Sequence, residues 1–291
     1  MTAGATDVFV EHRNLLFTVA YEMLGSAADA EDVLQETWLR WSEVDRSRVR
    51  DDRAYLVRIA TRLTLNRMRT NARRRESYVG PWLPEPLLTT PDVAEDVELA
   101  DSVSLAMLTL LETLSPTERA VFVLREVFDF GYDEIAAAVD KTPAAVRQVA
   151  HRARAHVDER RPVGPPSPTE HDRVMQGFLT AVSTGDVQGL MDVLAPDVVL
   201  ITDGGGVKKA ALRPILGRDK VLRFLDAVTT GIEAVVDVVE ANGAPALRVV
   251  VDGELDTVAS MVVEDGLVTG LYVVRNPAKL ARLDAVVTLT R

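Results

Sequence analysis

Apolar residues recur every three or four positions through the first half of the chain, a period that predicts α-helices. A first helix is predicted over residues 9–24, and Gly25 offers the left-handed residue on which helices often end. The hydroxyl of Ser26 can cap the next helix, with Asp29 completing a capping-box-like pattern. A third helix is predicted over residues 54–70. These three helices are expected to form one helical module over residues 1–77.

A second helical module is predicted over residues 102–161. Ser115 and Pro116 are residue types that begin helices, and a helix is predicted after them. Two short helices then flank the tripeptide "DKT", where Thr142 caps and Pro143 opens the second. Small and branched side chains on one side of this pair allow a close crossing. They are Ile135, Ala136, Val139, Val146, Val149, Ala150, Ala153 and Val157.

The period changes in the last part of the chain, which predicts an α+β domain over residues 169–277. Its first helix is predicted to start with Ser167 as cap and to end near residue 185. A strand, "DVVLITDGGG", and a helix, "GRDKVLRFLDAV", follow. The β-branched runs after them are broken by Asn242-Gly243 and Asp265-Gly266, which favour type I′ hairpins and an antiparallel sheet.

Three connecting segments remain: linkers over residues 78–101 and 162–168, and a tail over residues 278–291. The first linker contains "WLPEPL", in which prolines fix an extended path while tryptophan and leucine are apolar. A flexible tether would instead be rich in glycine and serine. The pattern therefore predicts a linker that docks onto a neighbouring surface through Trp82, Leu83 and Leu87, whether on its nearest module or on the last domain.

Charge is distributed unevenly along the chain, although the net charge is −11. Residues 46–75 hold eleven arginines against two acidic residues, and residues 141–161 hold six lysines and arginines against two acidic residues. Because phosphate contacts require basic side chains, these two stretches are where nucleic acid is expected to bind. The chain contains no cysteine, which excludes disulfides and a cysteine nucleophile.

No run of eighteen apolar residues or signal peptide is visible, which predicts a cytoplasmic protein without membrane contact. The four histidines fall in three predicted domains without ligand spacing, so no metal and no cofactor is expected. The last domain lacks a visible histidine–aspartate pair, so no catalytic residue is assigned and the chain is not expected to be an enzyme. Asp203, Asp256 and Tyr272 are the residues a catalytic alternative would use.

The helix pair at residues 132–158 has the spacing of a helix-turn-helix. The side opposite its apolar residues carries side chains that suit base edges in the major groove. They are Arg147, Gln148, His151, Arg152 and Arg154. An ordinary helical hairpin with a solvated basic face is the alternative.

The first module combines an acidic helix with an arginine-rich one. Asp32, Gln35, Glu36 and Leu39 give the former a mixed acidic and apolar face, which repels DNA and suits a protein partner with arginines, although a plain solvated helix has the same pattern. The arginine-rich helix suits DNA-strand separation or nonspecific RNA contact.

Two separated blocks resemble regions 2 and 4 of extracytoplasmic-function sigma factors. They are "GSAADAEDVLQETWLRW" with "AYLVRIATRLTLNRMR", and "LSPTERAVFVLREVFDFGYDEIAAAVDKTPAAVRQVAHRARA". The resemblance implies that core RNA polymerase binds Asp32, Gln35, Glu36 and Leu39. It implies that promoter DNA is read at the −35 element by the helix-turn-helix residues above. At the −10 element it would be read by Arg53, Arg58, Arg62, Asn66 and Arg69.

The rest of the chain resembles a SnoaL-like domain of the NTF2-like superfamily, which a subgroup of these sigma factors carries at the C-terminus. The expected fold is therefore two all-α sigma domains followed by an α+β NTF2-like cone with a curved antiparallel sheet. Three signatures carry the resemblance: "WLPEPL", "DGGGVKK" and "NPAKL". They contribute Trp82, Leu83, Pro84, Leu87, Asp203, Gly204, Gly205, Gly206, Lys208, Asn276, Pro277, Lys279 and Leu280.

These signatures suggest that the last domain holds the linker and thereby regulates the factor in cis. Asp203, together with Lys208 or Lys209, is expected to grip linker amides and carbonyls, while the glycines permit close backbone approach. A linker held in this way would set the distance between the two DNA-reading modules. The contrasting hypothesis is a DNA-binding module fused to a small-molecule-sensing or isomerase/cyclase-like enzyme domain, with a ligand in the C-terminal pocket.

Overall fold

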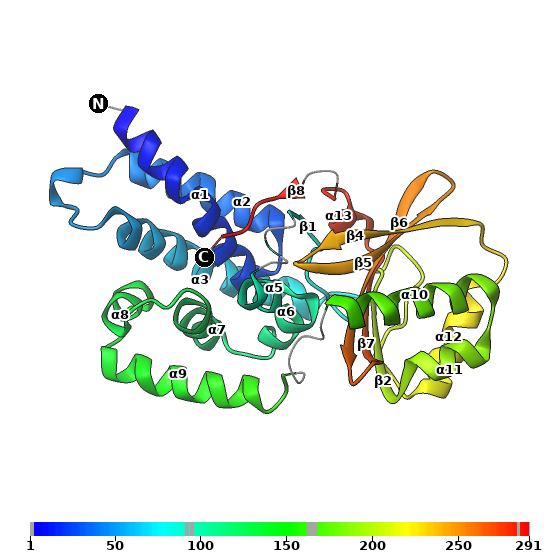
Figure 1. The fold of residues 1–291 in the computed structure, drawn as a ribbon. Coiled ribbons are helices and arrows are strands. Elements are labelled where there is room, and N and C mark those ends of the chain that lie inside the picture. The colour runs from blue at the N-terminus through cyan, green and yellow to red at the C-terminus, as the bar shows by residue number, and fades with distance from the viewer. Residues whose placement is uncertain (1–2, 91–92, 94–95, 162–167, 284–285, 291) are drawn as a thin grey trace.

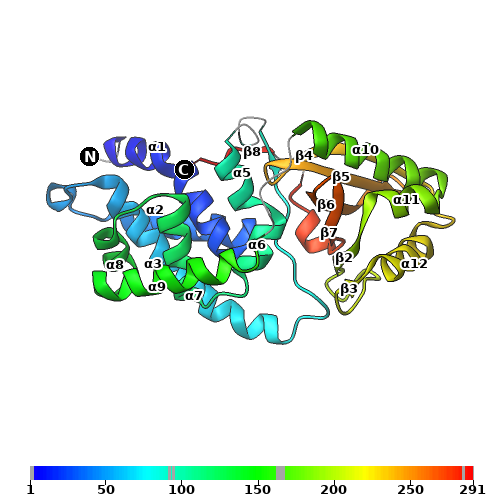
Figure 2. The same ribbon diagram turned by 60° about the horizontal axis from the view of Figure 1, so that its bottom comes forward.

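The computed structural model describes residues 3–90, 93, 96–161, 168–283 and 286–290. Its helical half and its sheet-containing half lie side by side, with α1–α9 on one side and the sheet with α10–α12 on the other (Figure 1). The segment that follows α3 runs between the two halves (Figure 2). The cap expected at Ser167, and residues 162–167 of the second linker, lie outside the described residues.

The first module consists of three long helices and one short 3₁₀ turn. α1 starts earlier than predicted. Ala5 in its first turn is buried, and the Trp41 indole N–H donates to the Ala5 carbonyl at 3.0 Å. α3 is longer than predicted at both ends, and Asp51 caps it by accepting from the Ala54 N–H. The elements are α1 (Ala3–Leu24), α2 (Ala27–Ser42), the 3₁₀ turn Arg46–Arg48 and α3 (Asp52–Glu76).

The second module follows the predicted capping pattern. Ser115 and Glu118 form a capping box with Pro116 in the first turn, and Thr142 caps the last helix by accepting from the Ala145 N–H. The helix predicted after Ser115 does not stay α-helical, since a π-helical turn follows α7. The elements are α5 (Val97–Val103), α6 (Leu105–Leu111), α7 (Pro116–Phe122), the π turn Val123–Val127, α8 (Tyr132–Val139) and α9 (Pro143–Asp158).

The two helical modules share one hydrophobic core, whereas the sequence suggested modules separated by a linker. Buried residues of α1, α2 and α3 form one continuous cluster with those of α5 to α9. Arg119 of α7 is fully buried within it and donates to the carbonyls of Met23 and Leu111, each at 2.8 Å. In this conformation the modules are therefore held together by direct packing as well as by the linker, because α1 packs against α7, and α3 packs against α7 and α8.

The C-terminal domain places three helices on one face of a curved sheet, as expected for an NTF2-like cone (Figures 1 and 2). The sheet is mixed rather than purely antiparallel, since β2 runs parallel to β7. The helices are α10 (Pro168–Thr184), α11 (Val187–Val193) and α12 (Arg218–Thr229). The strands are β2 (Leu194–Asp203), β3 (Ile215–Leu216), β4 (Ala234–Ala241), β5 (Ala244–Val251), β6 (Glu254–Glu264) and β7 (Leu267–Val274).

Three tight turns connect the strands β4 to β7. Asn242 and Asp265 have φ of 54° and 50°, and the glycine after each is also left-handed, which fits the predicted type I′ hairpins. A third turn at Asp252 and Gly253, with φ of 53° and 80°, was not predicted. An aspartate before glycine could have indicated it.

Both the first linker and the C-terminal tail contribute strands to the same sheet, whose order is β3-β2-β7-β6-β5-β4-β1-β8. β1 (Leu88–Thr89) of the linker pairs antiparallel with β4 through Leu88 and Ala241, and parallel with β8 (Val286–Val287) of the tail. The short helix α13 (Pro277–Leu280) precedes β8. Among the described residues, no helix combines the length and apolarity that crossing a membrane requires.

Candidate functional site

Helix α9 divides its side chains as the sequence predicts. Its apolar side, from Val146 to Val157, is buried against α7 and α8. The opposite side is exposed to solvent, and it carries Arg147, Gln148, His151, Arg152 and Arg154. The cationic surface predicted at residues 141–161 therefore exists on the outside of a helix-turn-helix.

Contacts within the module already orient the arginines of α9. Arg154 forms a two-pronged ion pair with Glu126, with hydrogen bonds of 3.0 and 2.7 Å. Arg147 lies over the ring of Tyr132, 5.4 Å from its centroid, and Arg152 is 3.8 Å from Glu118. Arg154 is thus more strongly committed to the protein than Arg147 or Arg152.

The arginine-rich helix α3 faces α8 with part of its surface. Arg62 is exposed, but its guanidinium donates to the carbonyl of Ala137 at 2.9 Å. Arg53 lies over the ring of Phe130 at 4.4 Å. The second module therefore covers part of the surface that the resemblance assigns to the −10 element.

The remaining −10 candidates, Arg58, Asn66 and Arg69, contact residues of α3 itself. Arg69 donates to the side chain of Asn66 at 2.9 Å, and both are exposed, while Arg58 lies half-buried over the ring of Tyr55. A groove of about 240 Å³ between α2 and α3 adjoins them. Its walls include Asn66 and Thr70 from α3 and Asp32 and Glu36 from α2.

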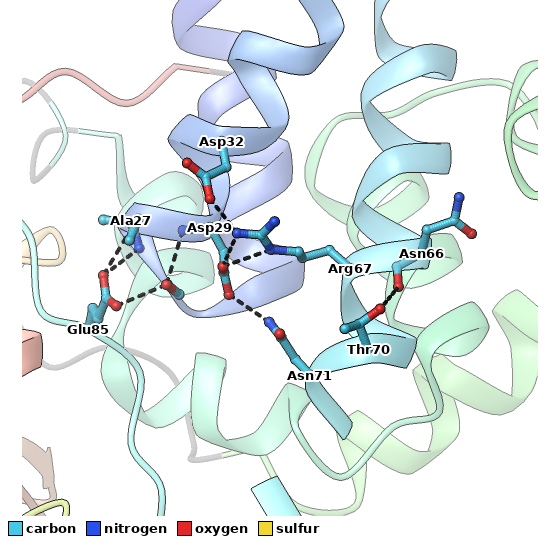
Figure 3. A network of polar contacts seen from close by, with 10 residues as sticks. Ala27, Asp29, Asp32, Asn66, Arg67, Thr70, Asn71 and Glu85 are labelled. Carbon is cyan, nitrogen blue, oxygen red and sulfur yellow. Dashed lines mark hydrogen bonds and ion pairs between the residues drawn. The ribbon is translucent and has the colours of Figure 1, made fainter. Parts of the chain in front are cut away.

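The acidic face of α2 is exposed as predicted, with Leu39 keeping 62% of its surface accessible. Arg67 of α3 ties this face to the groove, because its guanidinium pairs with both Asp29 and Asp32 (Figure 3). The Asn71 amide also donates to Asp29, at 2.6 Å. The carboxylate of Asp29 therefore joins α2 to α3, and the expected capping-box role is not what it does.

The linker supplies the cap that Asp29 does not. The Glu85 carboxylate accepts from the Ala27 N–H at 2.7 Å, the Ala28 N–H at 3.3 Å and the Ser26 hydroxyl at 2.9 Å (Figure 3). A negative charge at a helix N-terminus satisfies free N–H groups and favours the helix dipole. Residue Glu85 was missed by sequence reasoning, and its position between two prolines of "WLPEPL" was the only signal.

Replacing Glu85 with glutamine should weaken the attachment of the linker to α2. We expect the free energy of unfolding to fall by about 1–2 kcal/mol, because a charge-assisted helix cap becomes a neutral one. Urea unfolding followed by circular dichroism would measure this change. The matched control is Glu76→Gln at the C-terminal end of α3. This position is exposed, so the change should alter the free energy of unfolding by less than about 0.5 kcal/mol. Equal effects would contradict the capping role.

On its other side, the linker is bound by Asp203 at the end of β2, whose side chain is fully buried. Asp203 accepts from the Leu83 N–H at 2.9 Å and from the Tyr78 hydroxyl at 2.6 Å, and it pairs with the Lys279 ammonium at 2.7 Å. Lys279 also donates to the Leu83 carbonyl. Burial lowers the pKa of Lys279 to about 8, while the charge of Asp203 opposes this shift. One ion pair thus satisfies both backbone groups of Leu83.

Two leucines of the linker, Leu83 and Leu87, enter two different cores. Leu83 is buried in the C-terminal domain, in a cluster with Ala246, Leu280 and residues of β6 and β7. Leu87 belongs to the core of the helical modules. Its N–H donates to the Asn242 side chain and its carbonyl accepts from the Asn242 N–H, each at 2.9 Å. The linker is therefore fixed to both halves of the molecule.

The tryptophan of the linker lies between two cations. The ring of Trp82 is 3.8 Å from the Arg75 guanidinium and 3.9 Å from the Lys279 ammonium. A Cβ atom on Gly25 would lie 2.7 Å from this ring and 3.4 Å from Pro84. The linker therefore lies directly against the turn between α1 and α2.

The three glycines after β2 allow the close approach that the sequence predicts. A Cβ atom on Gly204 would lie 2.2 Å from the Lys208 carbonyl, and one on Gly205 would lie 2.4 Å from the Asn276 amide. Gly206 has φ of 73° and its missing Cβ would meet Val79 of the linker at 3.1 Å. Asn276, followed by Pro277, caps α13 and donates to the Tyr78 hydroxyl at 2.7 Å.

The structure corrects the expected role of Lys208. Its ammonium pairs with Asp256 at 2.9 Å, and Arg275 binds the same carboxylate. Lys279 contacts the linker instead, because α13 places it beside Asp203. Of the signature lysines, the one in "NPAKL" therefore forms the linker contact.

The sequence did not identify Tyr78, Tyr21 and Asn242 as contacts that hold the linker, although it placed Asn242 in a hairpin turn. The Asn242 amide donates to the Tyr21 hydroxyl at 2.7 Å, and that hydroxyl donates to the Glu85 carbonyl at 2.6 Å. Burial raises the pKa of both tyrosines, and the bond to Asp203 raises that of Tyr78 further. We call the residues Asp203, Asn242, Asn276 and Lys279, which bind residues 78–89, the linker site.

The second helical module presents an exposed cationic helix-turn-helix, and the first contributes an arginine-rich helix. Together they define a DNA-binding transcription factor. The family model for Sigma-70 region 2 matches residues 8–74, and the model for Sigma-70, region 4 matches residues 104–157. The chain belongs to the extracytoplasmic-function (ECF) RNA polymerase sigma factors.

Two relatives from Mycobacterium tuberculosis match almost the whole chain. The ECF RNA polymerase sigma factor SigJ is 35% identical over 283 residues, which cover 92% of this chain and 90% of SigJ. The probable ECF RNA polymerase sigma factor SigI is 32% identical over 281 residues, covering 94% of each chain. The crystal structure of SigJ has a TM-score of 0.77, with 31% identity, and covers 96% of this chain and 100% of its own. The fold of the whole chain, including the C-terminal domain, is thus the one found in SigJ.

Proposed function

We propose that α9 reads the −35 promoter element through Arg147, Gln148, His151 and Arg152. The observation that carries this proposal is the complete division of α9 into a buried apolar side and an exposed polar side with these four residues. Arginine and glutamine can each make paired hydrogen bonds to a purine in the major groove. Arg154 contributes mainly a positive charge near the backbone phosphates, since Glu126 already orients it.

The exposed face of α2 is the proposed contact with core RNA polymerase. Asp32, Gln35, Glu36 and Leu39 all lie at its surface. A partly exposed leucine within acidic side chains suits a basic partner surface with an apolar centre. The Arg67 ion pairs hold this face at a fixed angle to α3, so polymerase binding would orient the −10 candidates as well.

Reading the −10 element requires a rearrangement of the conformation described above. Arg58, Arg62, Asn66 and Arg69 are the proposed contacts, with Arg53 at the start of the helix. Arg62 is engaged by Ala137 of α8 and Arg53 by Phe130 just before this helix, so the second module has to move away from α3 before DNA can reach them. The closed arrangement is therefore proposed as a state that does not initiate transcription.

The C-terminal domain is proposed to regulate this opening in cis. It binds Leu83 and Leu87 of the linker through the linker site, and the linker in turn caps α2 through Glu85. A linker held at both sides restricts the relative positions of the modules. Release of the linker site would give them the freedom that promoter binding needs.

We propose that the C-terminal domain is a regulatory domain and not a catalytic one. The carboxylates that a catalytic alternative would use have other partners, since Asp203 pairs with Lys279 and Asp256 pairs with Lys208 and Arg275. We also propose that this domain receives a small-molecule ligand.

Run-off transcription with core RNA polymerase tests the −35 assignment. Replacing Arg147 with alanine should weaken binding to the preferred promoter by about 1–3 kcal/mol and relax selectivity at one base pair, because a base contact is lost. Binding and transcription would be compared on promoters with each base pair of the −35 element exchanged. Arg160→Ala is the control, because Arg160 lies beyond α9 and pairs with Glu159. A loss that is equal on all sequences would instead show a phosphate contact.

A further inference from the structure

A cavity of about 130 Å³ lies where the C-terminal domain meets the second helical module. Ser260 of β6 and Tyr272 of β7, which are direct cross-strand neighbours, lie on its sheet side. Ala106 and Met107 of α6 lie on its helical side. Both domains therefore contribute residues to its wall.

The cavity contains an unused polar side chain. His171 of α10 is only 7% exposed, yet among the described residues neither ring nitrogen has a partner with good hydrogen-bond geometry. Burial lowers the pKa of His171 and so favours the neutral ring, although the nearby Met261 backbone and the charge of Asp172 oppose the shift. A neutral imidazole offers one donor and one acceptor, and leaving both unpaired when buried is unfavourable.

The other walls favour a neutral and largely apolar ligand. Besides the hydroxyls of Ser260 and Tyr272, most lining side chains are small or apolar, including Leu105 and Val263. The one carboxylate on the wall, Asp101, is already paired with Arg161. Few polar groups in an apolar wall fix the orientation of a ligand and provide its specificity.

We propose that this cavity binds a neutral molecule about the size of a single aromatic ring, with one hydroxyl group that hydrogen-bonds to His171. The size follows from the volume, because an apolar cavity of about 150 Å³ accepts benzene. A hydroxyl group can both donate to and accept from the imidazole. The inference rests on the proposed ligand of the C-terminal domain and names its site and chemistry.

Such a ligand would act on the contact between the two domains. It would touch β6 and β7 on one side and α6 on the other, so it would bind the docked arrangement in preference to an open one. A ligand stabilises the conformation that it binds better. Binding would therefore hold the second helical module against the sheet.

Phenol and toluene test the inference, because they share one shape and differ by a hydroxyl in place of a methyl group. Ligand-observed NMR titrations on the full chain should show phenol binding about five- to tenfold more tightly, the gain expected from one hydrogen bond. In His171→Leu the preference should reverse, because toluene is the more apolar of the two. Equal affinities for phenol in both proteins would overturn the role of His171.

Ala106→Leu provides a second test that leaves the histidine in place. The larger side chain should fill the space, so that both compounds lose at least about tenfold in affinity. Phenol should raise the Tm of the unaltered chain by binding to the folded state, and it should not raise the Tm of this variant. Unchanged binding by this variant would place the compounds elsewhere. Absence of binding to the unaltered chain would overturn the proposal and indicate a water-filled cavity. These measurements need neither polymerase nor DNA, so their outcome is independent of promoter activity.

Discussion

Replacing Asp203 with asparagine is expected to lower the free energy of unfolding by about 3–5 kcal/mol, the usual cost of removing one partner of a buried ion pair. The variant leaves the ammonium of Lys279 buried without its counter-charge and weakens the hydrogen bonds to Tyr78 and Leu83. Urea unfolding would measure the loss. Hydrogen exchange should show that the Leu83 amide loses its protection before the core helices do.

The matched control is Lys208→Met, which removes a neighbouring ion pair that does not touch the linker. The side chain of Lys208 is 42% exposed, so its pair with Asp256 should contribute at most about 1 kcal/mol. If the two variants lose equal stability, Asp203 is not central to the linker site. Run-off transcription on the same proteins tests regulation separately. Release of the linker should change promoter output, and unchanged output would reject control in cis without affecting the assignment as a sigma factor.

Replacing Glu22 with glutamine is expected to stabilise the protein increasingly as the pH rises. Glu22 of α1 is fully buried. The Ser102 hydroxyl binds one of its carboxyl oxygens, and the other has no partner in the part of the chain that the structure describes. Burial raises its pKa to about 8, the Ser102 bond opposes this shift, and the charge of Asp101 adds to it. Between the unfolded value of 4.5 and about 8, the folded chain keeps a proton that the unfolded chain releases. Stability conferred by the protonated form therefore falls across this range.

The size of this effect follows from the shift in pKa. Across this range the free energy of unfolding of the wild-type protein falls by about 1.4 kcal/mol per pH unit, or about 4 kcal/mol by pH 8. Glutamine cannot titrate, so it removes this contribution to the pH dependence. The difference between Glu22→Gln and the wild type should thus grow by about 2–3 kcal/mol between about pH 5.5 and pH 7.5 in urea unfolding. Glu36→Gln, an exposed change on α2, should stay within about 0.5 kcal/mol of the wild type. A constant difference for Glu22→Gln would contradict the raised pKa.

Local features of the fold could be read from the sequence because neighbouring residues determine them. Thr142 and Pro143 begin α9, and the left-handed turns after β4 and β6 fall at Asn242 and Asp265. The exposed side of α9 follows from its helical period. These features depend on capping and turn chemistry within a few residues.

The contacts that the sequence did not predict join residues far apart in the chain. Glu85 caps a helix whose first residue is 58 positions away, and Tyr78 binds Asp203 over 125 positions. Lys208 and Lys279 both lie within signature motifs, and only the position of α13 decides which of them meets the linker. The shared core of the two helical modules likewise depends on how α3 packs against α7 and α8, which helical periodicity cannot specify.

The pairing of β1 with both β4 and β8 has a consequence for biosynthesis. Leu88 lies between Ala241 and Val286, so its neighbours in the sheet are translated roughly 150 and 200 residues after it. A strand cannot pair before its neighbours exist, and contacts across such separations form slowly. A nascent chain that has already completed its helical modules therefore lacks the β1 pairings, and for a transient period its linker is not yet fixed to the C-terminal sheet.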